Sequence, residues 1–199
     1  NGMVTIGGNT NDSIHYDGFV RGQLGPGNYV VFASQDKTDG FETYDAWAPS
    51  STDRDRSSDV LNFGAKYRFE LGERVAIDAR YQHTDARLDN TNPRLVAYSK
   101  NERDEDIASV GIDIAATDWA QVLVKGYWHD WDSTYTTIRN RLNNGGAGPG
   151  IATQIVTDNE TYWGFEDKGI NALAKFTPGG PFEYLVGYDY QTYSGKDDV

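Results

Sequence analysis

Residues 61–84 read LNFGAKYRFELGERVAIDARYQHT, and in them two runs of alternating residues meet at a short turn. In the first run the apolar or aromatic residues Leu61, Phe63, Ala65, Tyr67, Phe69 and Leu71 alternate with Asn62, Gly64, Lys66, Arg68 and Glu70. A period of two is that of a β-strand, whose successive side chains point to opposite faces. The stretch therefore predicts a β-hairpin with one apolar face and one charged face, and leaves open which face is inside.

The same alternation recurs along the chain, and no window shows the spacing of three and four residues that is typical of an amphipathic helix. We therefore predict an all-β chain with about nine antiparallel strands. The predicted strands cover residues 2–9, 13–24, 29–36, 59–71, 75–88, 105–116, 120–138, 161–176 and 182–194.

The connections between these strands alternate in length. Tight turns are predicted at 25–28, 72–74, 117–118 and 178–181, and long polar segments at 37–58, 89–104 and 139–160. Strict alternation places all short turns at one end of an up-and-down sheet and all long loops at the other. Outer-membrane β-barrels have this layout, whereas Greek-key sandwiches mix their loop lengths.

Composition excludes several classes of function. The chain has no cysteine, which rules out disulfides and thiolate metal sites. Its net charge of −12 argues against nucleic acid as a partner, because phosphate binding needs a basic surface. No apolar run is long enough for a membrane-spanning helix, and no signal peptide is visible. Neither a nucleophile motif nor a distinct carboxylate pair is present, so we do not expect an enzyme.

Three features favour a membrane barrel whose apolar face looks outward at lipid. Many apolar positions hold Ala, Gly or Val, which fill a sandwich core poorly, and the run 120–138 exceeds the usual strand length of about five or six residues. Aromatic residues gather near strand ends, as in the two girdles of a membrane barrel. They are Phe69, Trp119, Phe176 and Phe182 at the short turns, and Tyr81, Trp128, Trp131, Tyr162 and Trp163 toward the long loops.

We therefore predict an antiparallel up-and-down transmembrane β-barrel, closed because a sheet edge has no partners in lipid. The opposite face would then line an aqueous lumen. The predicted lumen-lining residues are Arg21, Lys66, Arg68, Asp78, Arg80 and Lys125. The segment 194–199, SGKDDV, reads as the start of an exposed loop, and we expect the chain to be a fragment of a larger barrel.

Two long stretches resemble TonB-dependent outer-membrane receptors. The first is GMVTIGGNTNDSIHYDGFVRGQLGPGNYVVFASQDKTDGFE at 2–42, in which Gly22-Gln23-Leu24 and Thr38-Asp39-Gly40-Phe41 match the ends of the first barrel strands. The second is ETYWGFEDKGINALAKFTPGGPFEYLVGYDYQTYSG at 160–195, in which Leu185-Val186-Gly187-Tyr188-Asp189-Tyr190 is similar to a recurring later strand.

This resemblance implies a barrel of about 22 strands filled by a plug domain, of which this chain supplies about nine strands without the plug. It also implies active uptake of a scarce nutrient, an iron–siderophore complex or haem, across the outer membrane of a Gram-negative bacterium. The implied partners are the lipid bilayer and lipopolysaccharide, the small-molecule ligand, and TonB through a missing N-terminal region.

Ligand contacts are predicted from aromatic residues at loops and rims, which can stack on an apolar ligand. The candidates are Tyr44, Trp47, Trp131 and Tyr135, although interface anchoring explains Trp131 equally well. A haem role would need a loop histidine, and His83 and His129 are the candidates. No metal site or other cofactor is expected, apart from calcium in a loop, for which Asp45, Asp53 and Asp55 are weak candidates beside the alternative of solvated charge.

Three other functions remain open at this point. The chain could belong to a passive porin of about 16 to 18 strands. It could form a small closed barrel of about eight strands with a structural or adhesive role. Less favoured is a secreted, soluble β-sandwich that binds carbohydrate and holds Phe63 and Tyr67 in its core.

Overall fold

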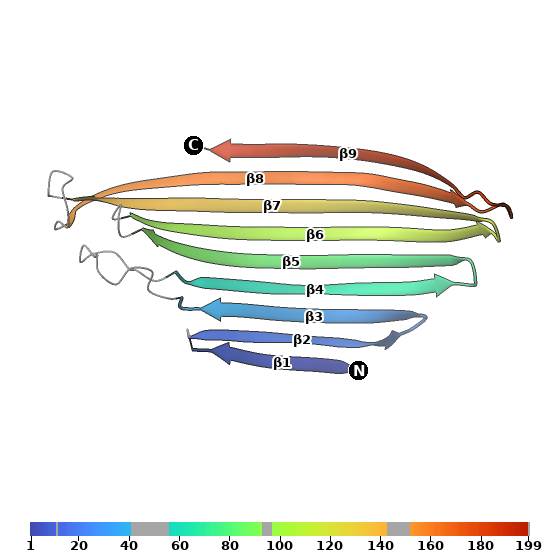
Figure 1. Cartoon of the computed structure of the whole chain (residues 1–199), viewed down its shortest axis with the longest axis horizontal. Coiled ribbons are helices and arrows are strands. Elements are labelled where there is room, and N and C mark those ends of the chain that lie inside the picture. Colours follow the sequence, from blue (N-terminus) through green and yellow to red (C-terminus); the bar gives the residue numbers. More distant parts are fainter. Residues whose placement is uncertain (11, 41–55, 93–96, 143–151, 199) are drawn as a thin grey trace.

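The computed structural model shows one antiparallel sheet in which nine strands lie side by side in chain order (Figure 1). It describes residues 1–10, 12–40, 56–92, 97–142 and 152–198. The strands are β1 (Gly2–Asn9), β2 (Ser13–Leu24), β3 (Gly27–Thr38), β4 (Ser58–Leu71), β5 (Val75–Asn92), β6 (Ala97–Thr117), β7 (Ala120–Leu142), β8 (Ala152–Phe176) and β9 (Tyr184–Asp198). The predicted all-β, up-and-down order is confirmed. Within the described ranges no helix is long and apolar enough to cross a membrane.

Several strands run further than predicted. Most of the expected loop 89–104 is strand, because β5 continues to Asn92 and β6 begins at Ala97. The expected loop 139–160 is likewise shortened by β7 and β8, and β9 extends through most of 194–199, which we expected to be loop. Polar residues on both faces hide the period of two there, although residues of opposite charge still face each other across the strands. Arg87 lies opposite Glu102, for example.

The register assigns every side chain to one of two faces, because directly opposite residues share a face. One row across the sheet joins Phe69, Ile77, Ile112, Val124, Ala172 and Tyr188, and we call the face that holds it the apolar face. The row one residue away joins Arg68, Asp78, Gly111, Lys125, Asn171 and Asp189, and we call that face the polar face.

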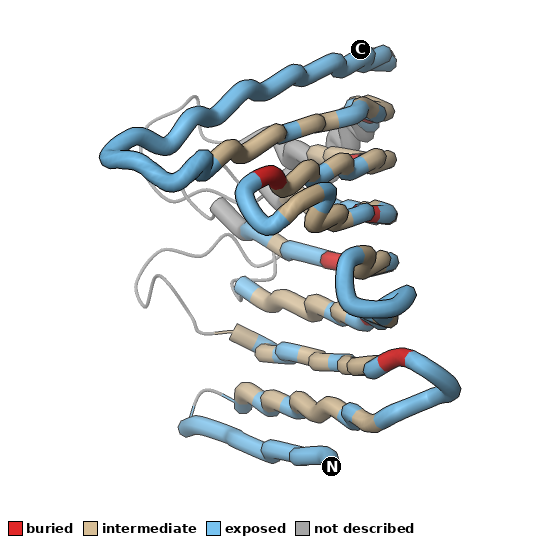
Figure 2. Tube along the Cα trace, turned by 90° about the vertical axis from the view of Figure 1, so that its right-hand side faces the viewer, coloured by how far each residue is buried: buried red, intermediate tan, exposed pale blue. Residues whose placement is uncertain are grey.

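The sheet has no hydrophobic core of its own. Among the described residues only Ala86 and Ala120 are buried apolar side chains, and Figure 2 shows a single layer that is mostly exposed or half-buried. On the apolar face, Val110 is 54% exposed and Val186 62%. Soluble monomers rarely leave so large an apolar surface uncovered. The sandwich alternative is therefore wrong for this chain, since the described strands form one layer.

The sheet is also open. In the described residues β1 pairs only with β2 and β9 only with β8, so the strands do not close into a barrel by themselves. The alternative of a small closed barrel of eight strands is therefore wrong as well, and β1 belongs to the same sheet as the other strands.

The apolar face changes character along the strands. Toward the short turns it is apolar, and in β6 this apolar band ends at Ala108. The next in-phase position, Asp106, lies opposite Asp130, which lies opposite Glu166. The same face therefore carries a band of apolar residues near the short turns and a row of carboxylates toward the long loops.

Candidate functional site

Five ring side chains gather on the polar face at the loop-side half of β7 and β8, and we call them the aromatic cluster. They are His129, Trp131, Tyr135, Trp163 and Phe165. Alternation along β7 gives its three members the same face, and the register brings the two members of β8 beside them. Trp131 lies directly opposite Phe165.

The rings of the cluster contact one another. The centroids of Trp131 and Phe165 are 5.3 Å apart, and His129 meets Phe165 edge-on at 5.1 Å. Tyr135 stacks on Trp163 at 6.3 Å with an interplanar angle of 17°. Such pairs contribute about 0.5–1.5 kcal/mol each beyond their buried area. The cluster is therefore a fixed aromatic surface on a strand scaffold.

Charged groups border one side of the cluster. The Arg103 guanidinium lies 5.2 Å from the centre of the Trp131 ring and forms an ion pair of 2.8 Å with Glu105. The other carboxylate oxygen of Glu105 is 2.8 Å from His129 Nε2, and His129 Nδ1 is 4.0 Å from Asp167. These contacts hold the imidazole and the guanidinium in place beside the indole.

Two buried polar atoms, one in the cluster and one beside it, lack a hydrogen-bond partner within the described residues. They are the indole nitrogen Nε1 of Trp131, which is a donor, and Oδ1 of Asp167, which is an acceptor. Buried polar groups without a partner cost roughly 1–3 kcal/mol each. The exposed ring surfaces beside them, with Trp163 40% exposed, are what the face offers to a ligand with an aromatic or apolar body.

The predicted ligand contacts are partly brought together. Trp131 and Tyr135 lie on the same face of β7, within the aromatic cluster. Trp131 and Trp163, also assigned to a membrane girdle, are on the polar face, so that part of the girdle prediction is wrong. Tyr44 and Trp47 lie outside the described residues, as do the weak calcium candidates Asp45, Asp53 and Asp55.

Phe165, Arg103 and Glu105 were missed as site residues. One signal for the orientation of the tryptophans was available, because Trp128 and Trp131 are an odd number of positions apart in one strand. Alternation then puts them on opposite faces. Arg103 and Phe165 come from the neighbouring strands β6 and β8. Their position beside Trp131 depends on the register of strand pairing, which the sequence of a single strand does not reveal.

The register places all six predicted lumen-lining residues on the polar face, toward the short turns from the aromatic cluster. They are Arg21, Lys66, Arg68, Asp78, Arg80 and Lys125. Together with the cluster they make the polar face aromatic at its loop end and cationic nearer the short turns. Their role in lining a passage stays a prediction.

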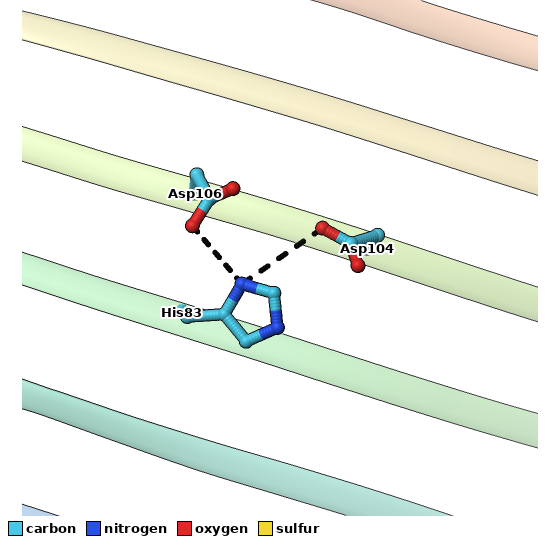
Figure 3. Close-up of side chains that lie close together, drawn as sticks. All are labelled: His83, Asp104 and Asp106. Carbon is cyan, nitrogen blue, oxygen red and sulfur yellow. Dashed lines mark hydrogen bonds and ion pairs between the residues drawn. The ribbon is translucent and has the colours of Figure 1, made fainter.

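A second group of side chains lies on the apolar face, at the start of the carboxylate row (Figure 3). His83 Nδ1 is 3.0 Å from Oδ1 of Asp106 and 3.9 Å from Oδ1 of Asp104. The Tyr81 hydroxyl donates to the same oxygen of Asp106 at 2.6 Å, and these two hydrogen bonds, led by that of Tyr81, lower the pKa of Asp106. One imidazole and two carboxylates are groups that can ligate a divalent ion.

The two candidate haem histidines therefore belong to different faces. His83 is on the apolar face with the carboxylates, and His129 is on the polar face, hydrogen-bonded to Glu105. They do not share a site.

Asp130 lies farther along the carboxylate row, and its pKa is raised. The largest cause is burial, and the second is the charge of the neighbouring carboxylates Asp132, Glu166 and Asp106.

Comparison with known proteins shows a likeness in fold. No protein-family model and no curated protein matches the sequence. The crystal structure of BauA, the ferric preacinetobactin receptor from Acinetobacter baumannii, is similar, with a TM-score of 0.57 at 13% sequence identity. The match covers 98% of this chain and 36% of the BauA chain, so this chain spans about a third of the receptor's length. At that identity the likeness shows the fold alone: these nine strands are arranged like part of a siderophore receptor.

Proposed function

We propose that this chain is a wall segment of a larger β-barrel receptor of the bacterial outer membrane, which takes up a scarce nutrient in a TonB-dependent way. The observation that carries the proposal is the separation of the two faces. A continuous apolar band is exposed on one face of a single-layer sheet, and ionic residues lie on the other. In a closed barrel the backbone N–H and C=O groups of each strand are hydrogen-bonded to neighbouring strands. Lipid can therefore cover such a band without leaving backbone groups unpaired.

The transported ligand we propose is a ferric siderophore. The aromatic cluster supports this class, because it offers rings for stacking beside the charged groups of Arg103 and Glu105. The fold likeness to a ferric siderophore receptor supports it too. Haem is less favoured, because Nε2 of His129 is already hydrogen-bonded to Glu105.

Transport by the intact protein in cells tests the proposal. We expect uptake of iron-55 delivered as siderophore complexes with aromatic chelating groups, and loss of that uptake when an uncoupler collapses the proton-motive force. Uptake that persists with the uncoupler, together with steady ion conductance in planar bilayers, would favour the passive porin instead.

A matched pair of tryptophan variants tests the site. Trp131→Ala removes the ring at the centre of the cluster and should weaken ligand binding about tenfold or more, as expected for a buried aromatic contact. Trp128→Ala removes the same side chain from the opposite face and should change the affinity less than about twofold. Equal affinities for both variants would show that the aromatic cluster is not the binding site.

A further inference from the structure

Two carboxylates converge on one ring nitrogen of His83, from the neighbouring strand β6 (Figure 3). Nδ1 is 3.0 Å from Oδ1 of Asp106 and 3.9 Å from Oδ1 of Asp104, and the three atoms lie within 4.8 Å of one another. Ligand atoms around a divalent ion are about 3 to 3.5 Å apart, because each lies about 2.0–2.2 Å from the ion. Small rotations of the side chains would therefore place all three atoms around one ion.

The other two histidines of the chain have a different arrangement. His15 Nδ1 is 2.5 Å from Asp36, while its Nε2 is 2.9 Å from Asp17. His129 likewise has one carboxylate near each ring nitrogen. The two nitrogens of an imidazole direct their lone pairs to different sides of the ring, so one ion binds only one of them. Only at His83 can an imidazole and two carboxylates reach the same ion.

Two further side chains hold the ligands in position. The Phe63 ring packs against the His83 imidazole, with centroids 4.9 Å apart. The Tyr81 hydroxyl donates a hydrogen bond of 2.6 Å to Asp106. Such a bond to a ligating carboxylate orients it for the metal. The side chains of His83 and Asp106 are half-buried, whereas that of Asp104 is 58% exposed and free to adjust.

The charge around these side chains favours a cation. Asp104 lies directly opposite Asp85, and Asp106 opposite Asp130, and like charges in such positions destabilise a sheet. The basic side chains on the same face of β5 to β9, within the described residues, are Arg87, Lys100, Lys168 and Lys196. The first three form ion pairs with other carboxylates, and the fourth is three strands from β6, about 14 Å away.

The kinds of ligand atom select the class of ion. Imidazole nitrogen is a typical ligand of Zn²⁺ and other transition metals, whereas Ca²⁺ takes about six to eight oxygen atoms. We propose that His83, Asp104 and Asp106 bind a divalent transition-metal ion such as Zn²⁺, with water in its remaining positions. The ion would link β5 to β6 on the face opposite the aromatic cluster. The proposal is therefore independent of which ligand is transported.

Calorimetric titration of the intact, detergent-purified protein with ZnCl₂ tests the proposal. We expect His83→Gln to lower the number of bound Zn²⁺ ions by one, and the matched variant His15→Gln to leave that number unchanged. Asp104→Asn changes an exposed side chain, so it should keep the fold, and it should weaken the affinity for Zn²⁺ about tenfold or more. Far-UV circular dichroism checks that each variant keeps its strand content.

Tyr81→Phe tests the hydrogen bond to Asp106. It should weaken Zn²⁺ binding about tenfold, as expected when a partner of a ligating carboxylate is lost. Three results would overturn the proposal: an unchanged Zn²⁺ titration for both His83→Gln and Asp104→Asn, the same loss for His15→Gln as for His83→Gln, or displacement of the Zn²⁺ by an equal concentration of Ca²⁺.

Discussion

Val110→Arg measures directly whether the apolar face contacts lipid. The Val110 side chain is 54% exposed in β6 and lies opposite Ala79 and Gly126, so an arginine meets no crowded core. On a sheet in water, such a surface change alters the free energy of unfolding by less than about 0.5 kcal/mol. On the lipid face of a barrel near the bilayer midplane, it costs about 2–4 kcal/mol. The loss on the lipid face thus corresponds to roughly 30-fold to nearly 1000-fold in the folding equilibrium, against less than about 2.5-fold for the sheet in water.

The measurement is urea unfolding of the intact protein in short-chain phosphatidylcholine vesicles, followed by tryptophan fluorescence. Ser109→Arg is the matched control, because it puts the same side chain one position away on the polar face. We expect the full loss for Val110→Arg and less than about 1 kcal/mol for Ser109→Arg. Most of the smaller loss would come from like-charge repulsion by Arg80 on the facing strand, since lumen-facing positions otherwise tolerate charge. Equal effects of the two variants, or a loss below about 0.5 kcal/mol for Val110→Arg, would refute the outward assignment of the apolar face.

Three further predictions concern stability and use the same unfolding assay. Burial and neighbouring carboxylates raise the pKa of Asp130 above its ordinary 3.8, so its ionised form is disfavoured in the folded state. Asp130→Asn should therefore increase the free energy of unfolding at pH 7. The gain should vanish below about pH 4, because the carboxyl is then protonated in both the folded and the unfolded state. A gain that persists at low pH would exclude the charge effect. Gly64→Ala should cost about 1–3 kcal/mol, because its β-carbon would meet a backbone carbonyl of β5 at 2.6 Å, whereas Gly126→Ala, with open space around it, should be neutral or slightly stabilising. Similar losses for both glycines would contradict this packing. Ser133→Ala removes a hydroxyl that is 2% exposed and donates to Asn101 at 2.9 Å, and should cost about 1–2 kcal/mol; no measurable loss would mean that water replaces the bond.

The parts of the fold that follow from sequence are those with a clear period of two. In β4 and β5 the apolar residues occupy one set of alternate positions, so the strands, the turn at 72–74 and the assignment of Phe69 and Lys66 to opposite faces could all be predicted. The loop-side ends of β5 to β8 could not, because polar residues there occupy both faces. Their pairing is set by cross-strand neighbours and the continuing backbone ladder, which no local pattern records.

The candidate site was less predictable for the same reason. Trp131 and Tyr135 could be chosen as exposed aromatic residues, but their partners Trp163 and Phe165 come from another strand, and only the register of β7 with β8 brings them together. The meeting of His83 with Asp106, 23 residues apart, is likewise a product of register. Spacing rules for metal ligands within one segment do not detect such groups.

The strands lengthen steadily across the sheet, from 8 residues in β1 to 25 in β8. At about 3.3 Å per residue, β8 spans about 80 Å, far more than the roughly 30 Å of a bilayer's hydrocarbon layer even when the strand is tilted. In the proposed orientation, the β7–β8 hairpin would stand well clear of the cell surface, while β1 to β3 would hardly emerge. Any large molecule that approached from outside the cell would meet that hairpin before any other described strand.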